Sequence, residues 1–168
     1  MKLRTSLSLL LMLLTLGLAA QGLMQYDNIP LKTANDCRKA EPQVMLAADY
    51  VYSSSIDKKD KNREGAIGFI MRWMNGTGDY SFVRDETVMR VCCNEKELIG
   101  IYMACTAKYA LSKGKAVDRE DLKINSFLLL AKYCENPANN CKPHGELKKL
   151  IEAKNRNQLK EFLEPKQK

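Results

Sequence analysis

Apolar residues recur every three or four positions along most of the chain, which is the spacing of one face of an α-helix. In the first such segment they are Val44, Ala47, Ala48 and Val51. Pro42 precedes them and fits the first turn of a helix, because its missing N–H would have no partner there. We therefore expect a helix from about Pro42 to residues 53–55. A second helix is predicted from about Lys59 to Met74, with Trp73 as a core anchor.

Two further helices are predicted in the middle of the chain. Charged residues at 84–86 open the first of them, which runs through Cys92. Asn94 fits the N-cap of the next one, because Glu97 follows at the spacing of a capping box. That helix carries one apolar stripe and ends at Gly114. The stripe consists of Leu98, Ile101, Tyr102, Cys105 and Tyr109.

The last third of the chain predicts two helices. The first begins at Asp118 and ends before Pro137, and its centre, Phe127 to Ala131, is apolar on every side. Such a segment favours a central position in a bundle. The final helix is predicted from about Gly145 to Leu163, and Pro165 follows it.

Five or six helices with short connections predict an all-α fold, either a single compact bundle or a stack of α-hairpins. Residues 23–168 are long enough to bury a core of their own as one domain. No repeat of fixed period indicates a solenoid.

The first 22 residues have the pattern of a signal peptide. Lys2 and Arg4 form a positive head, Leu7 to Leu18 is an apolar run too short to span a bilayer, and small residues follow at 17–22. We expect export with cleavage near residues 20–22, and a soluble periplasmic or secreted product. No later segment has the roughly 20 apolar residues of a membrane span.

The basic charge of the chain is spread out. The formal net charge is +7, and removing Lys2 and Arg4 leaves 25 basic against 20 acidic residues. Lysines at 58–61 and near the C-terminus alternate with acidic residues, which is typical of a solvated helix surface. Nucleic acid is therefore not an expected partner.

His144 is the only histidine, so it is the residue on which a catalytic base or a zinc site would depend. Cys134, Cys141 and His144 lack the fourth ligand and the close cysteine pair of a structural zinc site. Because His144 lies between Pro143 and Gly145 at a helix start, we expect a surface residue without a catalytic role. No motif indicates a cofactor, and we expect no enzymatic activity.

An exported chain meets an oxidising compartment, so the six cysteines are disulfide candidates. Cys134 ends a predicted helix and Cys141 follows a turn-rich loop, which favours a local disulfide between them. The partners of the other four cysteines stay open: Cys92 and Cys93 are adjacent, and one of them could reach Cys37 or Cys105. Cys105 also fits the apolar stripe as a small buried residue.

Three segments of the second half resemble uncharacterised small exported all-helical proteins of Bacteroidota: ELIGIYMACTAKYAL (97–111), DLKINSFLLLAKYCENP (121–137) and GELKKLIEA (145–153). More distantly, they are similar to the Tai-type immunity proteins, which neutralise amidase toxins delivered by type VI secretion. The shared features are a helical segment at Tyr102 to Ala104, in which a tyrosine is followed by a hydrophobic and then a small residue, and a helix end with Lys132, Tyr133 and Pro137. The resemblance implies a toxin-binding role. The family's cysteine pattern differs, so its disulfides and contact residues are not carried over.

A non-catalytic module that binds another protein fits these features best, and an immunity-type inhibitor of a cell-wall amidase toxin is its more specific form. A carrier of a small apolar ligand is the alternative, with an apolar patch at Met71, Trp73 and Met74 as its pocket. A hydrolase using scattered carboxylates is the third class. An apolar cavity would favour the carrier, an exposed apolar patch the binder, and facing carboxylates the enzyme.

Overall fold

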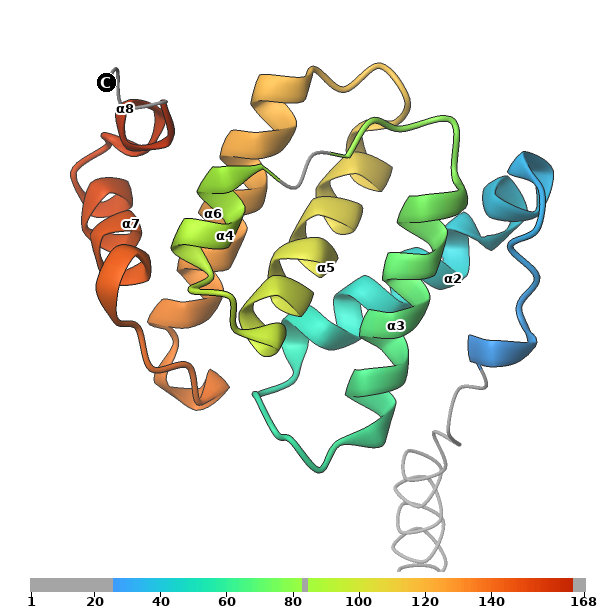
Figure 1. The fold of residues 1–168 in the computed structure, drawn as a ribbon, viewed down its shortest axis with the longest axis horizontal. Coiled ribbons are helices and arrows are strands. Elements are labelled where there is room, and N and C mark those ends of the chain that lie inside the picture. The colour runs from blue at the N-terminus through green and yellow to red at the C-terminus, as the bar shows by residue number, and fades with distance from the viewer. Residues whose placement is uncertain (1–25, 83–84, 165–168) are drawn as a thin grey trace, which may run out of the picture.

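The computed structural model describes residues 26–82 and 85–164, which form seven α-helices and two short 3₁₀-helices without any strand (Figure 1). The α-helices are α2 (Ala34–Ser53), α3 (Lys61–Gly76), α4 (Glu86–Val91), α5 (Lys96–Lys113), α6 (Arg119–Glu135), α7 (Gly145–Asn155) and α8 (Leu159–Leu163). The 3₁₀-helices are η2 (Tyr26–Asn28) and η3 (Pro137–Asn139). The predicted all-α class is confirmed. The expected signal peptide at 1–22, the helix opening at residue 84 and the closing Pro165 lie outside the described residues.

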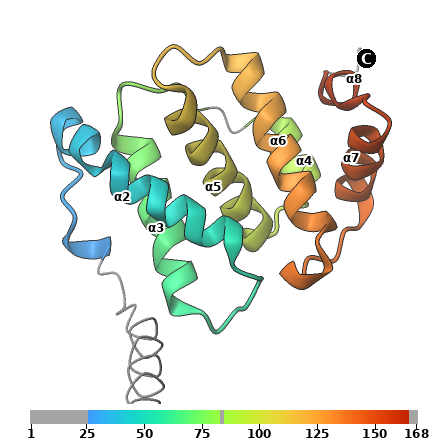
Figure 2. The same ribbon diagram turned by 180° about the vertical axis from the view of Figure 1, so that it is seen from behind.

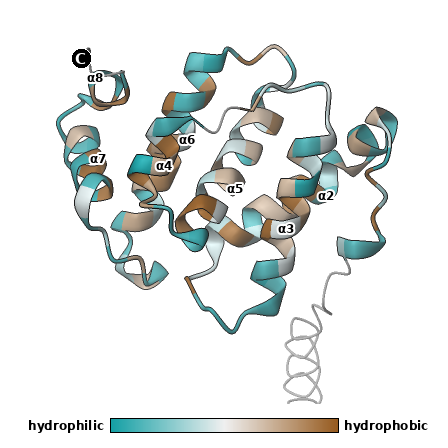
Figure 3. Ribbon diagram, in the orientation of Figure 1, coloured by the Kyte–Doolittle hydropathy of each residue, from teal (hydrophilic) through white to brown (hydrophobic). Residues whose placement is uncertain are grey.

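Helix α5 lies in the middle of the molecule, where it contacts α2, α3, α4 and α6. Helices α3 and α4 lie on the face seen in Figure 1, and α2 crosses the opposite face, seen in Figure 2. Helices α7 and α8 form the far edge beyond α6. Hydrophobic residues gather where α3, α4, α5 and α6 meet, and the outer ends of the helices are mostly hydrophilic (Figure 3).

The central position of α5 corrects the sequence prediction, which placed the 127–131 segment of α6 there. Side chains are buried on all sides of α5: Leu98, Ile101, Tyr102, Met103, Ala104, Cys105, Thr106, Ala107 and Ala110. In α6, by contrast, Leu128 and Leu129 are only partly buried. The small residues of α5 explain the difference, because they let neighbouring helices approach from every direction.

Gly100 marks the closest of these approaches. A Cβ atom on Gly100 would lie 2.8 Å from Cδ1 and 2.9 Å from Cγ2 of Ile67 on α3. Such distances are well inside van der Waals contact, so only glycine lets α3 and α5 pack at this separation.

Helix α2 begins eight residues earlier than the sequence predicted. Thr33 is its N-cap, and a capping box joins it to Asp36: the Thr33 side chain accepts from the Asp36 N–H, and the Asp36 carboxylate accepts from the Thr33 N–H. Pro42 therefore lies inside the helix. Pro42 is exposed, so the carbonyl group that it leaves unpaired can be hydrated.

Two other helix boundaries differ from the prediction because asparagines take left-handed backbone conformations. Asn94 has φ 58°, and the N-cap of α5 is Glu95, which makes no side-chain capping bond. The predicted Asn94–Glu97 capping box is therefore wrong. Asn157, with φ 56°, separates α7 from α8, so the predicted last helix is two helices.

The remaining boundaries agree with the prediction to within about two residues. The N-caps of α3, α4 and α6 are aspartates that accept backbone N–H groups: Asp60, Asp85 and Asp118. Helix α5 ends at Gly114, whose φ of 80° suits glycine.

A buried arginine joins three helices of the bundle. Arg63 of α3 is 1 % exposed, and its Nη1 donates to the carbonyl oxygen of Val51 at 2.7 Å and to the Ser54 hydroxyl at 2.7 Å. Its Nη2 donates to the Tyr133 hydroxyl of α6 at 3.2 Å. Tyr133 in turn donates to the Ser54 carbonyl oxygen. This network connects α3 and α6 to the end of α2.

Candidate functional site

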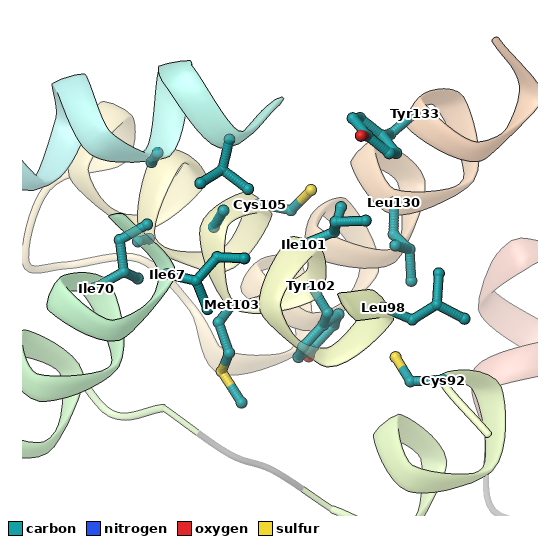
Figure 4. Packing of buried hydrophobic residues seen from close by; sticks show 14 of the residues in the cluster. Ile67, Ile70, Cys92, Leu98, Ile101, Tyr102, Met103, Cys105, Leu130 and Tyr133 are labelled. Atoms are coloured by element: carbon teal, nitrogen blue, oxygen red, sulfur yellow. The ribbon is translucent and has the colours of Figure 1, made fainter. Parts of the chain in front are cut away.

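A pocket of about 590 Å³ opens between α3, the segment 80–82 and α5. It is lined by Met71, Met74, Asn75, Tyr80, Ser81, Phe82, Tyr102, Met103 and Thr106. Most of these side chains are apolar, and three are methionines, whose flexible thioethers adapt to differently shaped partners. Met103 points away from α2 and from the centre of the core (Figure 4).

The rings of Tyr80 and Phe82 form one wall of this pocket. Their centroids lie 5.9 Å apart with an interplanar angle of 19°, and each centroid lies 5.5 Å from that of Trp73. Trp73 is fully buried, and its Nε1–H donates to the Cys37 carbonyl oxygen at 3.0 Å. Trp73 thus supports the wall from behind.

Of the expected patch at Met71, Trp73 and Met74, the two methionines line the pocket. Trp73 is a core residue and does not line it. The residues that the sequence reasoning missed come from the segment 80–82 and from α5. The alternation of polar and aromatic residues at 79–82 was the only local signal for this segment. Its contact with α3 and α5 depends on tertiary packing, which the local sequence does not reveal.

A second pocket, of about 520 Å³, continues the first toward the N-terminus of α6. The two share Ser81, Tyr102 and Thr106 as lining residues, and the second adds Asp85, Asp118, Arg119, Glu120, Leu122 and Lys123. We call the two pockets together the α5 groove. Methionine and aromatic side chains line the end of the α5 groove at α3, and charged residues line its other end, at α6, which we call the charged end.

An ion pair fixes the charged end of the α5 groove. Lys123 Nζ lies 2.6 Å from Asp85 Oδ2 and 3.3 Å from the Thr87 hydroxyl. Burial raises the pKa of Asp85, but the hydrogen bonds from Lys123 and from the Val88 N–H outweigh it, so the pKa of Asp85 is lowered. In the middle of the groove, burial raises the pKa of the Tyr102 phenol well above its ordinary value. The lowered pKa keeps the Asp85 carboxyl group ionised at neutral pH.

All six cysteines are free thiols in this structure. Cys134 and Cys141, the expected disulfide pair, interact electrostatically: the pKa of Cys134 is raised by Cys141, and that of Cys141 is lowered by Cys134. The disulfide itself stays a prediction. Burial raises the pKa of Cys92 to about 12, and Cys105 is completely buried.

His144 precedes α7 as its N-cap residue, and its side chain is 54 % exposed. Its Nε2 lies 2.6 Å from Glu95 Oε1, and its Nδ1 lies 3.9 Å from Cys93 Sγ. The sequence reasoning missed this cluster, because 49 and 51 positions separate His144 from the other two residues.

Among residues 26–82 and 85–164, no group of three or more His, Cys, Asp or Glu side chains is arranged to hold a metal ion. In the same residues, no helix has the length and apolar character needed to cross a membrane. The chain matches no family model, no curated protein and no solved structure.

Proposed function

We propose that this protein is an exported module that binds another protein through the α5 groove, without converting what it binds. The continuity of the two pockets across α5 is the observation that carries the proposal. The N-terminal 22 residues support export.

The shape and chemistry of the α5 groove suit an amphipathic segment of a partner protein. Met71, Met74 and Phe82 offer partly exposed apolar surface to an apolar anchor side chain. Burying one such side chain completely contributes about 1.5–3 kcal/mol. Lys123 and Asp118, at the other end of the groove, can pair with polar or charged groups of the same segment.

The charged end favours a protein over a small apolar ligand as the occupant. A carrier of a small apolar ligand is nevertheless the second candidate, because the volume of the first pocket falls within the roughly 300–1,000 Å³ of small-molecule sites. The occupant separates the two functions, since a carrier retains a small molecule and a binder retains a polypeptide.

The resemblance to Tai-type immunity proteins gives the binding proposal its most specific form. In that form the partner is an amidase toxin that acts on the cell wall. Co-expression of the chain with such a toxin in the periplasm tests this form of the proposal. Protection of the cells by the wild-type chain, lost in Met74→Glu, would support inhibition of the toxin. Equal killing with and without the chain would contradict it.

Site-specific photo-crosslinking tests the α5 groove as the binding site. A photoreactive residue replaces Met74 in the groove or, as a matched control, Leu46 of α2, which is 58 % exposed and does not line the groove. The variants are expressed with the full signal sequence, irradiated in intact cells and purified under denaturing conditions. Because both substitutions replace an accessible apolar side chain on a helix, they differ mainly in location.

We expect a discrete crosslinked polypeptide from position 74 and none from position 46. Equal products from both positions, or none from position 74, would contradict the groove as a protein-binding site. A crosslinked lipid or small metabolite at position 74 would favour the carrier instead.

A further inference from the structure

Cys93, Glu95 and His144 meet where the turn between α4 and α5 contacts the beginning of α7. Cys93 and Glu95 belong to the turn, and His144 is the N-cap of α7. None of the three lines the α5 groove, so this cluster forms a second site, independent of the proposed binding function.

The hydrogen bond to Glu95 determines which nitrogen of His144 faces the thiol. A carboxylate accepts only, so the 2.6 Å contact between Glu95 Oε1 and His144 Nε2 places the imidazole proton on Nε2. The lone pair of Nδ1 then faces Cys93 Sγ at 3.9 Å. This is the arrangement in which an imidazole takes a proton from a thiol while a carboxylate holds the ring.

The backbone around the thiol is held in uncommon conformations. Cys93 has φ 51°, in the left-handed region that non-glycine residues rarely adopt. Gly145, the first residue of α7, has φ 51° as well, and a Cβ atom built there would lie 3.9 Å from Cys93 Sγ. The thiol therefore lies against the beginning of α7.

No side chain caps the N-terminus of α7. Its amide groups carry partial positive charge, and the N–H groups of Gly145 and Glu146 precede the first intrahelical bonds. A thiolate at Cys93 would lie close to this end of α7, where the helix dipole favours negative charge.

Other groups face the cluster from the elements packed around it. The thiol also contacts the carbonyl oxygens of Arg90 at 3.7 Å and Val91 at 3.8 Å. Arg90 pairs with Glu146 of α7, which links α4 to α7 beside the thiol. The three contacts of Cys93 Sγ differ by only 0.2 Å, so rotation of the thiol proton suffices to exchange a carbonyl acceptor for His144 Nδ1.

We propose that Cys93 is a nucleophile for acyl transfer, with His144 as its general base and Glu95 as the positioning residue. His144 Nδ1 takes the thiol proton while Cys93 Sγ attacks the carbonyl carbon of an ester. The ester oxygen departs with the proton from His144, leaving a thioester on Cys93 and a free alcohol. Water then attacks the thioester, releasing the acid and restoring the thiol, so the net reaction is hydrolysis of one ester.

The surroundings of Glu95 favour a polar acyl group. Glu95 also lines a pocket of about 520 Å³ between α3 and the beginning of α5, together with Lys58, Lys61, Lys96 and several acidic residues. A substrate with polar or charged groups beside its ester can pair with these side chains.

Alkylation of the reduced, full-length protein with iodoacetamide tests the base. Peptide mass spectrometry follows the labelling of Cys93, with Cys141, which is also partly exposed, as the internal reference. We expect His144→Ala to slow the labelling of Cys93 by about tenfold or more and to leave that of Cys141 unchanged. Equal rates at Cys93 in both proteins, or recovery of Cys93 in a disulfide in the exported protein, would overturn the proposal.

The positioning role of Glu95 has a spectroscopic test. In nitrogen NMR of the His144 ring, we expect the proton on Nε2 in the wild type and a loss of that preference in Glu95→Ala, which removes the acceptor. An unchanged tautomer in Glu95→Ala would refute the role.

The covalent step is tested with 4-nitrophenyl acetate as the probe. We expect one acetyl group on Cys93 and a burst of nitrophenolate, both lost in Cys93→Ala and retained in Leu46→Glu, because Leu46 is exposed on α2 and lines neither site. Nitrophenolate release that is unaffected by Cys93→Ala would overturn the nucleophile. Thermal unfolding of each variant shows whether the fold is intact. The tests are separate from the groove proposal because Cys93, Glu95 and His144 do not line the α5 groove.

Discussion

At the scale of single residues, the absence of a side chain at Gly100 decides how α3 and α5 pack. We expect Gly100→Ala to lower the free energy of unfolding by about 1–3 kcal/mol, because the new methyl group overlaps Ile67. Gly68→Ala on α3 is the matched control, since its nearest neighbour would be the flexible end of Arg72 at 3.8 Å. That change should stabilise by up to about 1 kcal/mol. Urea unfolding measures both, and equal effects would contradict the close approach.

Arg63 gives a second prediction at this scale. Replacing Arg63 with Met removes the donors for Val51, Ser54 and Tyr133 in a buried site, and we expect a loss of about 3 kcal/mol or more. Arg72→Met is the control, because Arg72 is about half exposed and its ion pair with Asp27 lies at the surface. Its cost should stay below about 1 kcal/mol. Similar losses for both variants in thermal unfolding would show that the Arg63 network does not stabilise the bundle.

Cys134 lies near the end of α6, and Cys141 follows the 3₁₀-helix η3, so only a short loop separates the two thiols. We expect a disulfide between them in the exported protein, with a stabilisation of about 2–3 kcal/mol in the chain-entropy model. Peptide mapping without reduction detects it, and Cys134→Ala serves as the reference for stability. Two free thiols in protein recovered from an oxidising compartment would refute the pairing.

At the scale of elements, Asp79 joins the segment after α3 to α2 and to the loop after α5. Arg38 of α2 donates to its carboxylate at 2.7 Å, and Lys115, after α5, lies 2.8 Å from it. The Arg38 and Lys115 hydrogen bonds lower the pKa of Asp79 from 3.8 to about 2. A carboxyl group whose pKa is lower in the folded state stabilises above its unfolded pKa. This contribution is therefore complete above about pH 5 and is lost as the pH falls from about 4 to 2.

The variant Asp79→Asn tests whether Asp79 causes this loss of stability at low pH. We expect the variant to lose less stability than the wild type when the pH is lowered from 5 to about 2.5, because its side chain does not titrate. Urea unfolding at the two pH values measures the difference. The same loss in both proteins would show that the Arg38 and Lys115 contacts do not hold the segment after α3.

The helices themselves could be predicted from the sequence, because apolar spacing and aspartate caps are local signals. Asp60, Asp85 and Asp118 are N-caps, and Gly114 ends α5 as expected. The start of α2 was missed because an exposed proline is tolerated inside a helix when its unpaired carbonyl can be hydrated. Its signal, Thr33 followed by Asp36, was present in the sequence.

The sites were less accessible to sequence reasoning, since they depend on contacts between distant segments. Met71 and Met74 could be expected in a pocket from their stripe on α3, but the wall at 80–82 and the contribution of α5 could not. His144 was expected to be an exposed helix-leading residue, and its exposure agrees with that. Its contacts with Glu95 and Cys93 arise only because α7 packs against α4.

At the scale of the whole molecule, one buried helix organises two separate surfaces. The side of α5 that faces the segment 80–82 forms the floor of the α5 groove, and the turn before α5 carries Cys93 and Glu95. Partner binding and thiol chemistry can therefore be changed by separate substitutions. This separation makes the two proposals independent of each other.

Native mass spectrometry of the protein recovered from its exporting cell tests the central claim, that the α5 groove holds another protein. We expect a complex of the chain with a second polypeptide, absent in Met74→Glu because a carboxylate would be buried against the partner, and retained in Leu46→Glu. The same complex in all three proteins, or the chain alone or with a small apolar molecule in the wild type, would contradict it.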